Sequence, residues 1–240
     1  MTAKTLDVVG IGNAIVDVLV QTEEAFLDNH ALTKGTMALV DEAQAEQLYG
    51  SLGPGLETSG GSAANTLAGI AQLGSRAGFI GRVRDDQLGA IFAHDIRSVG
   101  ARFETPAATT GASTARCLIL VTPDAQRTMC TYLGASVGLD PADLDLEMVA
   151  QAQMLYLEGY LWDSDDAKKA FIAAAEVARA HGGEVALSLS DAFCVERHRD
   201  SFLELVDGHV DVLFANEMEI TALYQANSFE EAADQVRGRC

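Results

Sequence analysis

The chain has 240 residues, and its 16 Lys and Arg against 35 Asp and Glu give a formal net charge of −19. Nucleic-acid binding proteins neutralise phosphates with clustered Lys and Arg, and this sequence holds no such cluster, so non-specific nucleic-acid binding is excluded. Hydrophobic residues make up 48% of the chain, enough for a buried core, and no apolar run reaches the roughly 18 residues that cross a bilayer.

The N-terminus and the cysteines indicate the compartment. The first seven residues lack the apolar stretch of a secretory signal peptide, so we expect a cytoplasmic protein with no membrane partner. The cysteines are irregularly spaced without a C-x-x-C pair, which argues against a zinc site and a disulfide framework. We expect free thiols at Cys117, Cys130, Cys194 and Cys240.

Short runs rich in Val, Ile and Leu alternate with longer amphipathic stretches, which is typical of βα units in a parallel sheet. The predicted strands are residues 7–10, 77–80, 154–157, 185–188 and 211–214. The predicted helices are residues 62–73, 87–99, 165–181 and 196–206, with Gly74, Gly100 and Gly182 as C-terminal stops. The pattern predicts an α/β fold.

Two stretches depart from this alternation. They predict strands at 15–21 and 36–40, then at 115–121 and 127–132, without intervening helices. The second pair indicates a hairpin, because Pro123 and Asp124 favour a turn between its strands. We expect the four strands to form a small, mostly antiparallel sheet from about residues 15–40 and 111–133. This sheet would be a lid on one α/β domain spanning residues 1–240, not a separately folding domain.

The end of the sequence predicts an unfinished βα unit. Ser228 and Glu231 have the spacing of a capping box, which would open a helix running to Cys240. No strand follows this helix, so its unit lacks the next parallel strand. We therefore expect the sequence to be part of a longer protein, incomplete at its C-terminus.

The first motif follows the first predicted strand. Gly10 and Gly12 suggest a dinucleotide-binding loop, but the third glycine of that fingerprint would fall on Ile15, so this interpretation fails. Asp17 lies inside an apolar strand, where a carboxylate is disfavoured unless it has partners. Two adjacent sugar hydroxyls can be such partners. The alternative is a solvent-facing Asp17 at a sheet edge.

The second motif is a small-residue loop that opens a helix. Gly60 and Gly61 allow positive φ and close backbone approach, and the free N–H groups of the helix start can face a polar ligand. Asn65, one turn into the helix, can donate and accept hydrogen bonds. The alternative is a tight turn with Ser62 as the N-cap.

The third motif is an Asn216-x-x-Glu219 pair after the last predicted strand. One interpretation is a capping box without a catalytic role. The other is a ligand site, because α/β sheets bind ligands at the carboxyl ends of their strands, and Glu219 could hold a magnesium-bound water. Glu158 and Asp191 follow strands in the same way, so the sequence predicts three acidic side chains at one edge of the sheet.

Other chemistries lack their motifs. The five histidines show no H-E-x-x-H spacing, and no G-x-S-x-G nucleophile elbow is present, which excludes the corresponding hydrolases. No G-x-x-x-x-G-K-[ST] loop occurs, so a P-loop kinase is also excluded.

Five motifs occur in a fixed order along the chain: Gly10-x-Gly12-Asn13-x-x-x-Asp17, Gly60-Gly61-Ser62-Ala63-Ala64-Asn65, Ile80-Gly81 to Asp86-x-x-Gly89, Glu158-Gly159-Tyr160 and Asn216-Glu217-Met218-Glu219. Their order and spacing resemble the ribokinase-like (PfkB) family of carbohydrate and nucleoside kinases, and residues 118–129 and 187–194 resemble its bacterial adenosine-kinase-like branch. The resemblance implies a three-layer α/β/α sandwich with a mostly parallel central sheet and a small β-sheet lid.

The resemblance also implies a reaction. It is the transfer of the γ-phosphoryl group of ATP, with Mg²⁺, to a primary hydroxyl of a sugar or nucleoside, adenosine being favoured. The family match would give the acceptor site to Asn13, Asp17, Gly60, Gly61 and Asn65, with support from Glu158. It would give ATP phosphate contacts to Asn216 and Glu219, and a water-mediated magnesium contact to Glu219.

The sequence departs from the family pattern. Arg84 replaces the Gly of the G-x-x-G-x-D element, and Ala192 stands where Pro is common. The D-T-x-G-A-G-D motif, which carries the family's catalytic base and anion hole, does not occur in the chain. We therefore assign no catalytic residue and expect the chain alone to be inactive. The alternative is a non-catalytic module that binds a nucleoside or sugar, or that forms a homodimer through its lid.

Overall fold

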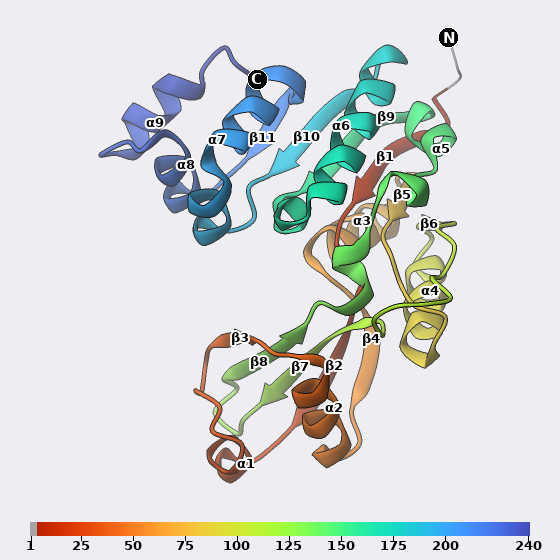
Figure 1. Ribbon diagram of the computed structural model, residues 1–240, viewed down its shortest axis with the longest axis vertical. Coiled ribbons are helices and arrows are strands. Elements are labelled where there is room, and N and C mark those ends of the chain that lie inside the picture. Colours follow the sequence, from red (N-terminus) through yellow and green to blue (C-terminus); the bar gives the residue numbers. More distant parts are fainter. Residues whose placement is uncertain (1–3) are drawn as a thin grey trace.

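The computed structural model describes residues 4–240 and arranges them around two β-sheets (Figure 1). The large sheet has six strands in the order β11-β10-β9-β1-β5-β6, and every neighbouring pair is parallel. Its strands are β1 (Leu6–Ile11), β5 (Ala77–Ile80), β6 (Arg102–Phe103), β9 (Ala152–Glu158), β10 (Glu184–Ser188) and β11 (Val212–Phe214). The predicted parallel sheet is confirmed.

Helices cover both faces of the large sheet. They are α3 (Ser62–Gln72), α4 (Gln87–Ser98), α5 (Leu146–Ala150), α6 (Asp165–Ala180), α7 (Ala192–His209), α8 (Glu217–Tyr224) and α9 (Phe229–Val236). Val9 and Ile11 of β1 belong to an apolar cluster with α5 to α9, whereas Val8 packs into the cluster of α3 and α4. Because alternate residues of a strand face opposite sides, these clusters confirm the three-layer sandwich.

Several helix boundaries differ from the prediction, most of all the start of α7 and the end of α9. Helix α7 begins at Ala192 rather than Glu196, because the Asp191 side chain caps it by accepting from two backbone amides of the first turn. Helix α9 ends at Val236 rather than Cys240, and Gly238 has a positive φ just beyond. The capping box predicted there is only half formed: the Ser228 hydroxyl accepts from the amide of Glu231, while the Glu231 carboxylate accepts from Asn227.

The small sheet projects from one end of the large sheet (Figure 1). Its strands, in the order β3-β8-β7-β2-β4, are β2 (Ile15–Gln21), β3 (Met37–Leu39), β4 (Leu56–Gly60), β7 (Ala115–Val121) and β8 (Arg127–Tyr132). Only the β2–β4 and β7–β8 pairs are antiparallel; β2–β7 and β3–β8 are parallel. The expectation of a mostly antiparallel sheet was therefore wrong, because β2 and β7 enter the sheet side by side, with Ile15 opposite Ala115.

The small sheet also contains elements that the sequence pattern did not reveal. Helix α1 (Glu24–Asn29) separates β2 from β3, which were predicted to follow one another without a helix, and helix α2 (Glu42–Ser51) leads from β3 to β4, a strand that was not predicted. Helix α2 buries only Ala45 and Leu48, so its apolar periodicity is weak. Strand β4 has Leu56 as its only large apolar residue, and that side chain is exposed.

The cysteines are free, as predicted: Cys117, Cys130 and Cys194 are buried and Cys240 is exposed. Within residues 4–240, no helix combines the length and the apolar character that a membrane crossing requires.

Candidate functional site

A pocket of about 530 Å³ lies between the small sheet and the carboxyl ends of the large-sheet strands. This volume is in the range of small-molecule sites. Several predicted site residues line it: Asn13, Asp17, Gly61, Asn65 and Glu158. The strand order of the large sheet reverses at β1, and α/β sheets bind ligands at the carboxyl edge of such a switch point.

Asp17 lies in a row of pocket side chains that crosses the small sheet. Strand register places it opposite Cys117 of β7, which is opposite Thr131 of β8, which is opposite Leu39 of β3. Strand β2 is flanked on both sides, so the alternative of an Asp17 at a sheet edge is wrong. Asp17 is instead a carboxylate on the pocket-facing side of a sheet interior.

Burial raises the pKa of Asp17 to about 6, although a hydrogen bond from the Asn65 side chain opposes this shift. Gly60 provides the space for its carboxylate, since a Cβ at that position would lie 2.3 Å from Asp17 Oδ2. Asn65 comes from α3 and Gly60 from β4, so two elements that meet at Gly61 hold the Asp17 side chain. The carboxylate keeps acceptor capacity for a ligand.

Gly61 is the N-cap residue of α3 and has a φ of 100°. A Cβ there would also lie 2.3 Å from the backbone oxygen of Asn13, so only glycine fits. Ser62 is the first helical residue, which contradicts the alternative of Ser62 as N-cap. The Glu158 carboxylate satisfies the helix start instead, because Oε1 accepts from the amide of Ala63 at 3.1 Å.

Glu158 and Asn13 are hydrogen-bonded to each other, and both side chains are almost fully buried. Glu158 Oε2 accepts from the Asn13 backbone amide at 2.5 Å and from Asn13 Nδ2 at 3.2 Å. Asn13 Oδ1 accepts from the Ser136 hydroxyl at 2.8 Å. Burial raises the pKa of Glu158, and the hydrogen bonds from Asn13, Ala63 and Ser62 oppose the rise.

The three acidic residues predicted at one sheet edge each lie at a helix start. Glu158 accepts from a first-turn amide of α3 and Asp191 from two first-turn amides of α7, whereas Glu219 accepts from the amide of Asn216, the N-cap of α8. Burial, and then the negative charges of Asp191, Glu158 and Glu219, raise the pKa of Tyr160 to about 12. Tyr160 itself lines the pocket.

Asn216 and Glu219 form a complete capping box, the alternative that the sequence left open. Glu219 Oε2 accepts from the Asn216 amide at 3.0 Å, Oε1 accepts from Asn216 Nδ2 at 2.7 Å, and Asn216 Oδ1 accepts from the Glu219 amide. Neither residue lines the pocket. Among residues 4–240, no group of three His, Cys, Asp or Glu could hold a metal ion.

Sequence reasoning missed the apolar half of the pocket. Its walls include Met37, Leu39, Met129, Leu133, Tyr160 and Phe193. Alternation along the predicted strands shows which side chains share a face, but only strand pairing shows that this face covers a cavity. Phe193 is 72% exposed and Leu39 is 64% exposed, so neither side chain lies in the hydrophobic core, where large apolar residues are usually found.

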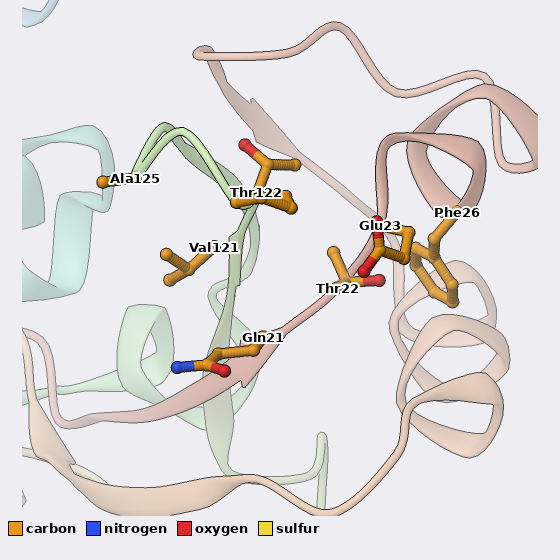
Figure 2. A pocket seen from close by; sticks show the side chains of 8 residues that line it. Gln21, Thr22, Glu23, Phe26, Val121, Thr122 and Ala125 are labelled. Carbon is orange, nitrogen blue, oxygen red and sulfur yellow. The ribbon is translucent and has the colours of Figure 1, made fainter.

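A second hollow, of about 730 Å³, lies at the far end of the small sheet (Figure 2). Its lining comes from the end of β2 and the turn after β7, with Glu23 as the one charged side chain in that lining. No predicted site residue contributes to it. The convergence of Asp17, Asn65 and Glu158 therefore favours the pocket between the two sheets.

Comparison with known proteins identifies the relatives of this chain. Residues 53–238 match the model of the pfkB family of carbohydrate kinases. The structure is similar to adenosine kinase from Sinorhizobium meliloti, with a TM-score of 0.87 and 49% identity over 99% of this chain and 73% of that one. It is also similar to a probable sugar kinase from Rhizobium etli CFN 42, with a TM-score of 0.87 and 47% identity over 100% of this chain and 72% of that one.

Curated relatives match over shorter segments. The 5-dehydro-2-deoxygluconokinase of Geobacillus kaustophilus is 32% identical over 135 residues, which are 54% of this chain and 40% of that protein. Fructokinase-1 of Oryza sativa is 25% identical over 182 residues, which are 73% of this chain and 56% of that protein. The chain thus spans about half the length of the curated relatives that it matches.

Proposed function

The chain belongs to the pfkB family of carbohydrate kinases, and from this premise we propose that its pocket holds a nucleoside, adenosine first, whose primary hydroxyl accepts the γ-phosphoryl group of ATP. The observation that carries the proposal is the change of chemistry along the small-sheet wall of the pocket, which runs from the polar Asp17 on β2 to the apolar Met129 on β8 and Leu39 on β3. A nucleoside has the same two parts.

The polar end suits a ribose. An ionised carboxylate accepts hydrogen bonds from two adjacent hydroxyls, each worth about 1.5–3 kcal/mol, and Asp17 has that capacity. Asn65 adds an amide, and Gly60 and Gly61 let the backbone approach closely. In this proposal Asn13 and Glu158 support the acceptor site from the large-sheet side.

The apolar end suits a nucleobase. Met37, Leu39 and Met129 line it from the small sheet, and Tyr160 and Phe193 line it from the large-sheet side. A purine presents two flat faces that such side chains can cover, whereas a free pentose or hexose presents hydroxyls on every side. This contrast supports a nucleoside over a free sugar, in line with the 49% identity to the Sinorhizobium adenosine kinase.

We place ATP at the carboxyl end of β11, beside Asn216 and Glu219, where ATP would supply the phosphoryl group. Glu219 is 7% exposed and retains acceptor positions for a magnesium-bound water. The sequence contains no D-T-x-G-A-G-D motif, so we assign the catalytic base to none of its residues. The second candidate is a nucleoside- or sugar-binding module without chemistry, which would use the same pocket.

Calorimetric titration of the chain with adenosine, ribose and fructose tests the proposal. We expect adenosine to bind most tightly, and Asp17→Asn to weaken its binding by roughly 10- to 100-fold, the loss of one or two charge-assisted hydrogen bonds. Asp28→Asn is the matched control, since Asp28 lies on the exposed surface of α1 and outside the pocket. Tighter binding of fructose than of adenosine, or an effect of Asp28→Asn equal to that of Asp17→Asn, would contradict the proposal.

A further inference from the structure

Four crossing segments carry the chain between the two sheets. The first joins β1 to β2 and contains Gly12 and Asn13, and the second joins β4 to α3 at Gly61. The third enters β7 through Thr114, and the fourth leaves β8 through Gly134. Any rotation of the small sheet against the large sheet must change the backbone of these segments.

The crossing segments pack against one another without space for side chains. A Cβ at Gly12 would lie 2.5 Å from the Cβ of Ala63, so the first segment touches the second. A Cβ at Gly134 would lie 2.2 Å from the backbone oxygen of Ser113, and the amide of Ala135 donates to the same oxygen at 2.8 Å. The third and fourth segments are therefore also in direct contact.

One buried carboxylate links three of the segments. Glu158, 1% exposed, accepts from Asn13 of the first segment and from Ala63, just after the second. The Ser136 hydroxyl, in the 3₁₀ turn that follows the fourth segment, shares its proton between Asn13 Oδ1 at 2.8 Å and Leu133 O at 2.5 Å. The chain of contacts Ser136–Asn13–Glu158–Ala63 thus spans the base of the small sheet.

A second carboxylate holds the remaining segment. Asp86, the N-cap of α4, accepts from the Thr114 amide at 2.9 Å and from its hydroxyl at 2.7 Å. Gly89 permits this contact, because a Cβ there would lie 2.0 Å from Arg84 O and 3.1 Å from Thr114 Oγ1. All four crossing segments are therefore tied, directly or through one neighbour, to a carboxylate of the large-sheet body.

Glu158 and Asp17 both line the pocket but differ in the acceptor capacity that they can offer a ligand. Both oxygens of Glu158 already accept from protein donors, and its side chain is almost inaccessible. Asp17 receives a hydrogen bond from Asn65 and faces the cavity. A ligand hydroxyl can reach Asp17 without breaking a contact, whereas at Glu158 it would have to compete with the donors of Asn13, Ala63 and Ser62 that already occupy the carboxylate.

We propose that Glu158 is a positioning residue: with Asn13 and Ser136 it fixes the angle of the small sheet on the large sheet, and so the separation of the pocket walls, without touching the acceptor. The proposal rests on the proposed function for its ligand. It implies that weakening this contact chain loosens both walls at once, so that every ligand of the pocket loses affinity by the same factor.

Binding of hydroxyl-deleted ligands separates the two roles. We expect Ser136→Ala and Glu158→Gln to weaken adenosine, 2′-deoxyadenosine and 3′-deoxyadenosine alike, by roughly tenfold for Ser136→Ala, the effect of one lost hydrogen bond. Ser136 does not line the pocket, so its effect cannot be a lost ligand contact. Phe171→Leu, on the buried face of α6, is the control for lost stability and should leave all three affinities unchanged. An effect of Glu158→Gln that disappears with one deoxy ligand would place Glu158 on that hydroxyl and overturn the proposal.

The angle itself can be measured without ligand. Spin labels at Arg127→Cys on β8 and Lys169→Cys on α6, both exposed positions, report the distance between the small sheet and the large-sheet body. The background carries Cys240→Ser, since the other three cysteines are buried. Ser136→Ala and Glu158→Gln should broaden this distance distribution, and Phe171→Leu should not.

An unchanged width of the distance distribution in both Ser136→Ala and Glu158→Gln would overturn the proposal. If the unsubstituted chain bound no nucleoside while these two variants still broadened the distribution, the proposed function would fail and the positioning role of Glu158 would stand. Should Glu158→Gln fail to fold, because its amide group opposes a backbone N–H, Ser136→Ala alone decides, since it removes one hydroxyl from the same contact chain.

Discussion

Asp17 places a carboxylate in the pocket, where burial disfavours its charged form but a ligand hydroxyl can donate a hydrogen bond to it. Because burial raises its pKa from 3.8 to about 6, the folded protein binds a proton between these values that the unfolded chain has lost. Stability therefore falls as the pH rises from about 4 to about 6, and the loss persists at higher pH.

This sign gives a prediction for Asp17→Asn. The variant should be more stable than the unsubstituted chain above pH 6, with the difference shrinking towards pH 4, while its affinity for adenosine is lower. Melting temperatures of both proteins measured from pH 4 to pH 8 check the first part. A difference in melting temperature between the two proteins that stays constant from pH 4 to pH 8 would show that the carboxylate is not destabilised by burial.

Gly61 is the residue whose backbone the site needs most. Gly61→Ala combines a positive φ with a Cβ 2.3 Å from the backbone oxygen of Asn13, so we expect a loss of about 2–4 kcal/mol in the free energy of unfolding. Gly53→Ala is the matched control, because nothing lies within 4 Å of its Cβ position and its φ is not in the left-handed region. Urea denaturation should show the loss only for Gly61→Ala; equal losses would mean that the close approach to Asn13 is unimportant.

At the scale of elements, the Glu219 side chain at the start of α8 has two roles to separate: it completes a capping box, and in our proposal it also holds a magnesium-bound water. Glu219→Ala removes a capping box and should cost about 1 kcal/mol of stability. If Glu219 also holds a magnesium-bound water, the variant should weaken magnesium-dependent ATP binding as well. Ser228→Ala, which removes the N-cap of α9, is the control for capping alone. A Glu219→Ala protein that resembles Ser228→Ala in both measurements would leave Glu219 with the cap only.

Four predicted strands, residues 15–21, 77–80, 115–121 and 127–132, have the same bounds in the structure. They are short runs without Pro in which β-branched, aromatic or other apolar residues recur, and in the last three a Gly or Pro follows within two residues of the strand end. Strand β4 escaped because its sequence, Leu-Glu-Thr-Ser-Gly, has one large apolar residue. Its position is decided by pairing with β2, a tertiary contact that propensity does not contain.

The site was predictable to the extent that a polar residue stood out from an apolar context. Asp17 interrupts an apolar strand, Glu158 directly follows one, and Gly60 and Gly61 open a helix, so each could be singled out. Met37 and Leu39 could not, because an apolar strand residue that lines a pocket has the same sequence pattern as one in the core. Nor could the parallel pairing of β2 with β7, which joins segments far apart in the sequence.

At the scale of the whole molecule, the large sheet supplies a rigid edge and the small sheet covers it. The acceptor would lie between them, whereas Asn216 and Glu219 lie outside the pocket lining. In-line phosphoryl transfer needs a positioned base and donors for the transferred group, and we assign neither to this chain.

We therefore predict that the purified 240-residue chain forms no AMP from adenosine, ATP and magnesium. Radiolabelled transfer from ATP, followed by chromatography, is the measurement. AMP formation that Asp17→Ala abolishes, which excludes a contaminating kinase, would show that a base exists among these residues.

The central claim is that Asp17 holds the ribose hydroxyls of a nucleoside in the pocket between the sheets. Its most direct test is a cycle of calorimetric affinities that pairs Asp17→Asn with the removal of the 2′- or 3′-hydroxyl of adenosine. We predict a coupling free energy of about 1–2 kcal/mol for at least one hydroxyl, because either change removes the same hydrogen bond. Additive losses for both hydroxyls, with no coupling, would contradict the claim.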